Sequence, residues 1–121
     1  TMDDLANRMY ACLADSSLPR YVRSLLRNDL LILDEVGYLT LGKAASDHLF
    51  QLVSKTYEKV SLVVTSNLDF SEWGTLFASP STAAAVLDRL LHHAHVITLR
   101  GDSYRVRNRL VPPVLTKAKE G

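Results

Sequence analysis

Two adjacent carboxylates close a short apolar run in this chain. The run 30–33 (LLIL) is followed at once by Asp34 and Glu35. Four consecutive apolar residues between turn signals are typical of a buried strand in a parallel sheet, and open α/β sheets bind ligands beyond the carboxyl ends of such strands. There, one carboxylate can hold the water shell of Mg²⁺ and the other can act as a general base on an attacking water. The alternative interpretation is a strand that simply ends in an acidic turn.

A second apolar, β-branched run strengthens the first interpretation. Residues 60–65 (VSLVVT) predict another strand, which Ser66 and Asn67 end. With the helix predicted between the runs, the order is that of the Walker B strand and its neighbour in P-loop NTPases. In the AAA+ branch of these enzymes a polar residue called sensor 1 ends that neighbour and orients the lytic water. Asn67 fits this role, although Asn is also common in strand-end turns.

A glycine pattern after the first strand partly matches a phosphate-binding loop. Gly37 to Lys43 matches the start of G-x-x-x-x-G-K-[ST], the loop that cradles phosphates, but Ala44 stands where the hydroxyl residue belongs. That hydroxyl holds Mg²⁺, and the pattern here follows the acidic pair rather than a strand of its own. We therefore interpret it as a turn and not as a phosphate-binding loop.

The elements that must position these residues form an α/β pattern in one domain, predicted over residues 1–110. Strand, helix and strand in this order, with short links, indicate a parallel βαβ unit. A hairpin is predicted from residues 95–99 and 103–107 around Gly101 and Asp102. Amphipathic helices are predicted at 3–14, 17–28, 44–57 and 80–94, and a loop or short helix at 68–79.

Composition narrows the class of protein. The 121 residues carry a net charge of +1, contain one cysteine, Cys12, and show no apolar run long enough to cross a bilayer, so we expect a cytoplasmic protein with no membrane partner. Residues 100–121 hold six basic and two acidic side chains. This segment, with a tail predicted to be flexible at 111–121, is either a solvated terminus or a contact for nucleic acid.

The histidines do not predict a metal centre. His92 and His93 are adjacent on a predicted helix and His95 follows in a predicted strand, without a cysteine pair or a carboxylate at ligand spacing. We expect no dedicated protein metal site. Histidines at a helix C-terminus are favoured by the helix dipole, which explains them without a metal.

Three stretches then resemble a known family. LLILDEVGYL, LFQLVSKTYEKVSLVVTSNLDFSEWGTLF and AAAVLDRLLHHAHVITLRGDSYRVR, within about residues 20–109, resemble the C-terminal two thirds of the IstB-like ATP-binding proteins. These are AAA+ helper proteins of insertion-sequence transposition and relatives of the DnaC-like helicase loaders. The resemblance implies a partial AAA+ or RecA-like P-loop NTPase domain, with a parallel sheet, flanking helices and a C-terminal β-hairpin.

The family pattern also implies roles for single residues. Asp34 and Glu35 resemble Walker B, with Mg²⁺ held by Asp34 through water, and Asn67 resembles sensor 1. Arg89 resembles the arginine that reaches the ATP site of a neighbouring subunit, and it lies off the apolar stripe of its predicted helix. A surface pair of Asp88 and Arg89 is the alternative. Arg105 is a weaker candidate for a phosphate sensor.

One departure from the family limits what these residues can do alone. No glycine precedes Gly37, so the family's phosphate loop is missing from the sequence, and we expect a fragment or truncated form that binds ATP poorly. The resemblance implies ATP and Mg²⁺ as cofactors, and DNA phosphates, a transposase or another replication or recombination partner, and further copies of the chain as partners. Two other functions remain open: a helicase-loader ATPase and a non-enzymatic interaction module.

Overall fold

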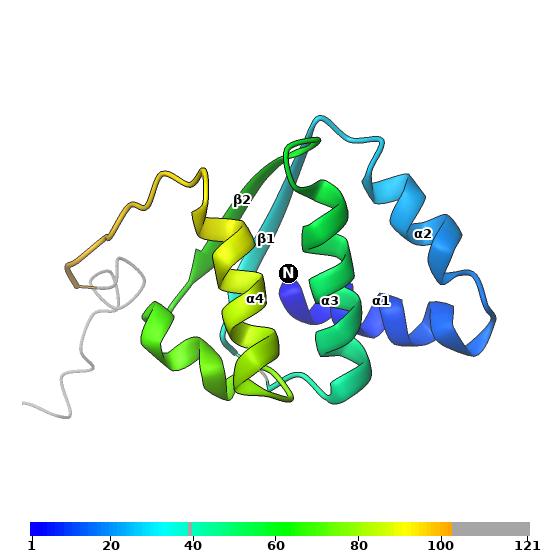
Figure 1. The fold of residues 1–121 in the computed structure, drawn as a ribbon, viewed down its shortest axis with the longest axis horizontal. Helices are drawn as coiled ribbons and strands as arrows, with labels where there is room; N and C mark the ends of the chain where they lie inside the picture. Colours follow the sequence, from blue (N-terminus) through cyan, green and yellow to red (C-terminus); the bar gives the residue numbers. More distant parts are fainter. Residues whose placement is uncertain (39, 103–121) are drawn as a thin grey trace, which may run out of the picture.

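The computed structural model of the chain describes residues 1–38 and 40–102. Each helix and strand predicted between residues 3 and 94 is confirmed there, with ends shifted by no more than about one turn, and the 68–79 segment contains a short 3₁₀ helix. In chain order the elements of Figure 1 are α1 (Met2–Ala14), α2 (Leu18–Leu25), β1 (Leu30–Val36), α3 (Lys43–Thr56), β2 (Ser61–Ser66), η1 (Phe70–Thr75) and α4 (Pro80–Leu91).

Local chemistry accounts for where the helices begin. The Thr1 hydroxyl accepts a hydrogen bond from the Asp4 N–H at 3.2 Å, which caps α1. The Ser79 hydroxyl accepts from the Thr82 N–H at 3.2 Å in the same way, and Pro80 follows in the first turn of α4, where its missing N–H costs nothing.

β1 and β2 form a parallel two-stranded sheet that brings their carboxyl ends to one edge. Leu30 pairs with Ser61 and Leu33 with Val64. α3 connects the two strands, and Figure 1 shows that α3 and α4 both run back from the carboxyl ends of the strands toward their starts. The sheet edge at the strand ends is therefore also the edge at which α3 and α4 begin.

The prediction that the first strand is buried, on both faces as in a parallel sheet, is wrong for one face of β1. Leu33 is buried, whereas Ile32 is 61% exposed and its partner Val63 is 45% exposed. Alternate residues of a strand point to opposite faces, so one face packs against the core and the other remains open. An apolar run shows that a strand can be buried but not that both of its faces are covered.

The core joins the covered side of the sheet to the helices. Cys12 is buried, and Trp73 and Phe77 anchor the segment around η1, with exposed fractions of 2% and 4%. The buried cluster comprises Met2, Leu5, Ala6, Met9, Val22, Leu33, Val36, Leu41, Ala45, Leu49, Leu52, Val53, Trp73, Leu76, Phe77, Ala83 and Val86.

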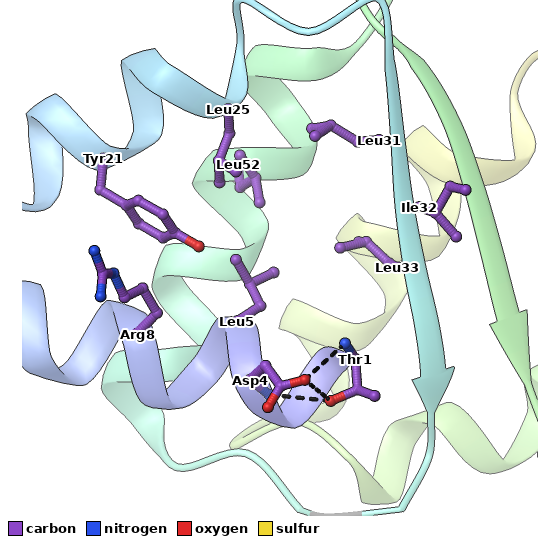
Figure 2. A pocket seen from close by; sticks show the side chains of 10 residues that line it. All are labelled: Thr1, Asp4, Leu5, Arg8, Tyr21, Leu25, Leu31, Ile32, Leu33 and Leu52. Carbon is purple, nitrogen blue, oxygen red and sulfur yellow. Dashed lines mark hydrogen bonds and ion pairs between the residues drawn. The ribbon is translucent and has the colours of Figure 1, made fainter.

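A pocket of about 530 Å³ opens between α1, α2 and β1 (Figure 2). Its lining is mainly apolar, and Arg8 lies over the ring of Tyr21 at 5.7 Å. The predicted site residues Asp34 and Glu35 do not line it. The pocket reflects incomplete packing beside β1 and is separate from the chemistry that the sequence predicts.

The predicted C-terminal hairpin is not confirmed. Residues 95–100 adopt no regular secondary structure, and Ile97 and Leu99 are 79% and 90% exposed. A strand requires a partner for its backbone groups, and none of the described residues pairs with this segment. The second arm at 103–107, Arg105 and the predicted tail at 111–121 lie outside the described residues. No helix in the described part is long and apolar enough to cross a membrane.

Candidate functional site at the carboxyl edge of the sheet

The acidic pair lies in an irregularity of β1. Leu33 pairs with Val64 and Val36 pairs with Ser66, so β1 has one more residue than β2 over this interval. The extra residue is accommodated at Glu35, whose φ of 62° lies in the left-handed region that residues other than glycine rarely adopt. The bulge sets both carboxylate residues opposite a single residue of β2.

The residue opposite the bulge is Thr65, and its hydroxyl contacts both acidic residues. The hydroxyl accepts a hydrogen bond from the Glu35 backbone N–H at 3.0 Å and donates one to the carboxylate of Asp34. Asp34 is exposed and Glu35 is half-buried. Thr65 thus fixes the backbone at Glu35 and the side chain of Asp34 at once, and it leaves the carboxylates open to solvent.

Asn67 is placed beside the same edge by a close contact with Gly37. A Cβ on Gly37 would lie 2.6 Å from the Asn67 Oδ1 and 2.9 Å from the Leu68 Cγ, and Gly37 has a φ of 123°. Only glycine fits this position. The turn is held further by the Ser66 hydroxyl, which donates to the Val36 carbonyl at 2.6 Å and accepts from the Leu68 N–H at 3.1 Å.

Described residues of the Gly37–Lys43 segment support its interpretation as something other than a phosphate-binding loop. The Leu41 N–H donates to the Leu76 carbonyl at 2.7 Å, and the Leu41 side chain is buried. Lys43 pairs with Asp47 one turn along α3 at 3.3 Å. A phosphate cradle needs free backbone N–H groups and a lysine directed at the ligand, whereas the Leu41 N–H and the Lys43 ammonium have partners within the chain.

The donors at this edge fit a hydrated divalent cation. Mg²⁺ prefers oxygen ligands and keeps several waters, and an exposed aspartate that is oriented by a hydroxyl can accept hydrogen bonds from such waters. Asp34 has this environment through Thr65. Asp34, Glu35 and Asn67 are therefore brought to one edge, as the sequence predicted, while their roles stay predictions.

Arg89 lies away from that edge. Its Nη1 donates to the Ala85 carbonyl at 3.2 Å, and its guanidinium carbon lies 4.6 Å from the centre of the Phe50 ring. One turn further along α4, His92 contacts Tyr57, which lies just before β2 begins. Arg89 is therefore near the starts of the strands, whereas Asp34 is near their ends, and the two do not form one site within this chain.

The histidines at the end of α4 pack against the turn before β2. Tyr57 contacts the Nδ1 of His92, and His93 Nε2 lies 2.9 Å from a Glu58 carboxylate oxygen. Desolvation, followed by the nearby Glu58, raises the pKa of Tyr57, so the phenol stays protonated and can donate to His92. In the described part of the chain, no group of three or more His, Cys, Asp or Glu side chains is placed to hold a metal ion.

Sequence reasoning missed two residues of this site. Thr65 was considered only as the end of a strand, and Gly37 only as part of a glycine pattern. A threonine opposite an acidic pair gives no signal until the pairing register is known. The glycine did signal a special backbone, but not that its missing side chain makes room for Asn67.

Comparison with known proteins gives a consistent result. A family profile described as IstB-like ATP-binding protein matches residues 1–111. A Pseudomonas aeruginosa protein named for ATP binding and insertion sequence IS21 is 37% identical, over 96% of this chain and 44% of its own length. A Geobacillus stearothermophilus protein named in the same way for IS5376 is 38% identical, over 90% of this chain and 43% of its own length. The chain thus spans less than half the length of these relatives.

Proposed function

This chain belongs to the IstB-like ATP-binding proteins, and from that premise we propose that it supplies the hydrolytic part of an ATP site in a helper protein of DNA transposition. The observation that carries the proposal is the bulge at Asp34 and Glu35, with Thr65 opposite it and Asn67 beside it. The names of the relatives, which join ATP binding to insertion sequences, support transposition as the process.

Each residue at the edge then has a distinct task. Asp34 holds the water shell of Mg²⁺, and Mg²⁺, when bound, neutralises charge on the phosphates. Glu35 accepts a proton from the attacking water as general base, and Asn67 orients that water through its amide. Thr65 acts through the other residues, because its hydroxyl sets the direction of the Asp34 carboxylate.

Arg89 completes the site of a neighbouring subunit in this proposal. Among the described residues its guanidinium contacts Ala85 and the Phe50 ring and neither carboxylate of its own chain, which favours action in trans. An arginine supplied in this way stabilises charge that develops on the transferred phosphoryl group.

We place the rest of the ATP site outside this chain and the DNA contact in residues 100–121. No complete G-x-x-x-x-G-K-[ST] pattern occurs in the 121 residues, and the relatives are more than twice as long, so we place the phosphate cradle in the remainder of the full-length protein. The six basic side chains of residues 100–121 are candidates for contacts with DNA phosphates, which would make binding dependent on salt. A transposase is the proposed protein partner.

The first test compares two glutamates in the full-length protein. Glu35→Gln removes the base, and we expect ATP binding to persist while turnover falls by about 10²- to 10⁴-fold. The control is Glu58→Gln, a change of the same chemistry at the opposite edge of the sheet, which should leave turnover unchanged. Turnover of Glu35→Gln equal to that of the unaltered protein would remove Glu35 from the mechanism.

A further inference from the structure

The guanidinium of Arg89 is held on an aromatic ring of the neighbouring helix. Its carbon lies 4.6 Å from the centre of the Phe50 ring on α3, and its Nη1 donates to the Ala85 carbonyl at 3.2 Å. We propose that Phe50 is a positioning residue for Arg89, which presents the guanidinium to the ATP site of a neighbouring subunit. The inference rests on the proposed function and adds to it a residue that the sequence motifs do not single out.

The contact leaves most of the guanidinium available. An aromatic ring attracts the face of the cation, whereas its five N–H donors point outward in the plane of the group. Within the described part of the chain one of these donors is engaged, with Ala85. The remaining donors can therefore bind phosphate oxygens while the face stays on the ring.

Phe50 is suited to this task because its ring packs at the margin of the core and not inside it. Phe50 is half-buried and packs at the margin of the core, whereas its neighbours Leu49 and Leu52 on α3 are 3% and 2% exposed. A groove of about 270 Å³ opens beside it between α3 and α4, lined by Asp47, Phe50, Ser81, Thr82 and Ala85. Arg89 thus lies at a surface that another subunit can approach.

The contact with Phe50 pre-organises the Arg89 side chain. A free arginine side chain populates many rotamers, and a catalytic contact requires one of them. The ring and the Ala85 carbonyl restrict these rotamers before the neighbour arrives. Loss of the ring should therefore lower the rate of the chemical step and leave the affinity for ATP unchanged.

The first experiment measures ATP turnover of the full-length protein, with DNA present, for Phe50→Leu and Phe50→Tyr. Leucine keeps an apolar side chain without a ring, and tyrosine keeps the ring. We expect kcat to fall about threefold to tenfold for Phe50→Leu, with KM for ATP and the melting temperature unchanged, and to stay near the original value for Phe50→Tyr. Asp47→Asn, in the same groove, is the matched control and should retain its kcat.

Three results would overturn the inference. The first is an unchanged kcat for Phe50→Leu, and the second is a fall in kcat for Phe50→Tyr as large as that for Phe50→Leu. The third is an equally large fall in kcat for Asp47→Asn, which would assign the effect to the groove rather than to the ring. If Phe50→Leu fails to fold, Phe50→Met provides a second ring-free variant for the same measurement.

The second experiment asks on which subunit Phe50 acts. Phe50→Leu protein is mixed with an excess of Glu35→Gln protein, whose subunits cannot hydrolyse ATP but carry an intact Arg89. We expect the rate per Phe50→Leu subunit to recover, because the Arg89 that reaches its ATP site then comes from a Glu35→Gln subunit with an intact Phe50. A rate that does not recover would place the effect of Phe50 in its own subunit and reject the inference.

Arg89→Ala in the same two assays separates the inference from the proposed function. If Arg89→Ala turns over ATP normally, the role of Arg89 itself is wrong. If Arg89→Ala is inactive alone and is rescued by Glu35→Gln protein while Phe50→Leu behaves as the unaltered protein, the proposed function stands and only the role of Phe50 fails.

Discussion

Thr65 is the residue on which the geometry of the acidic pair depends. Its single hydroxyl accepts from the Glu35 N–H and donates to the Asp34 carboxylate, so one side chain ties both members of the pair to β2. Because a hydroxyl can donate and accept at the same time, no apolar residue of the same shape can replace it. The same edge depends on Gly37, whose missing side chain makes room for Asn67.

Replacement of Thr65 by valine tests the first of these contacts. Valine has nearly the same shape without the hydroxyl, and we expect a loss of about 1 kcal/mol in the free energy of unfolding, together with slower ATP turnover in the full-length protein. Chemical denaturation and a turnover assay measure the two effects. Thr65→Ser keeps the hydroxyl and should preserve both quantities. A serine variant as impaired as the valine variant would show that the hydroxyl is not what matters.

Replacement of Gly37 by alanine tests the second contact. The new Cβ would meet the Asn67 Oδ1 at 2.6 Å in a backbone conformation that alanine resists, so we expect a cost of about 1–3 kcal/mol in stability. Turnover should fall as Asn67 is displaced. Gly74→Ala is the control, since nothing lies within 4 Å of its added Cβ. Equal melting temperatures for the two variants would contradict the prediction.

The helices and strands show what periodicity can and cannot predict. The apolar spacing in α1, α3 and α4, the apolar run in β1 and the β-branched run in β2 located these five elements, because burial of one face determines both the period and the element. The bulge escaped prediction, since Glu35 adopts a positive φ without being a glycine. The 95–99 segment has the composition of a strand but finds no partner among the described residues, and composition cannot supply one.

Ser46 links α3 to the segment just before α4, and its replacement tests how much this link stabilises the fold. It is fully buried in the first turn of α3, and its hydroxyl accepts from the Ala78 N–H at 3.0 Å, just before α4. Ser46→Ala would leave that N–H unpaired, and we expect a loss of about 1–3 kcal/mol in a denaturation experiment. Ser54→Ala on the same helix, where the hydroxyl contacts only its own helix at Phe50, should change stability little.

Helices cover one face of the two-stranded sheet, and the other face is open to solvent in the described part of the chain. Ile32 and Val63 pair with each other across the open face of the sheet and are 61% and 45% exposed. Contiguous exposed apolar residues usually mark an interface. Because the relatives are more than twice as long, we expect the remainder of the full-length protein to cover this face.

The open face predicts how the 121-residue chain behaves alone. We expect it to self-associate at micromolar concentrations, and Ile32→Thr, which keeps a β-branched residue but adds a polar atom, should weaken that association. Sedimentation velocity over a range of concentrations measures it. Leu13→Gln is the control, because Leu13 is exposed on α1, away from the sheet. Association unaffected by Ile32→Thr but relieved by Leu13→Gln would place the contact on the helices instead.

The uneven length of β1 and β2 has a consequence for how this chain tolerates deletions. If either Asp34 or Glu35 were removed, Leu33 would still pair with Val64 and Val36 with Ser66, and the ladder between them would become regular. Both apolar side chains would keep their places in the core. The strand pairing and the core therefore do not require the extra residue of β1. In the proposed function the additional residue serves the chemistry, so we expect a single-codon deletion here to give a well-folded but inactive protein.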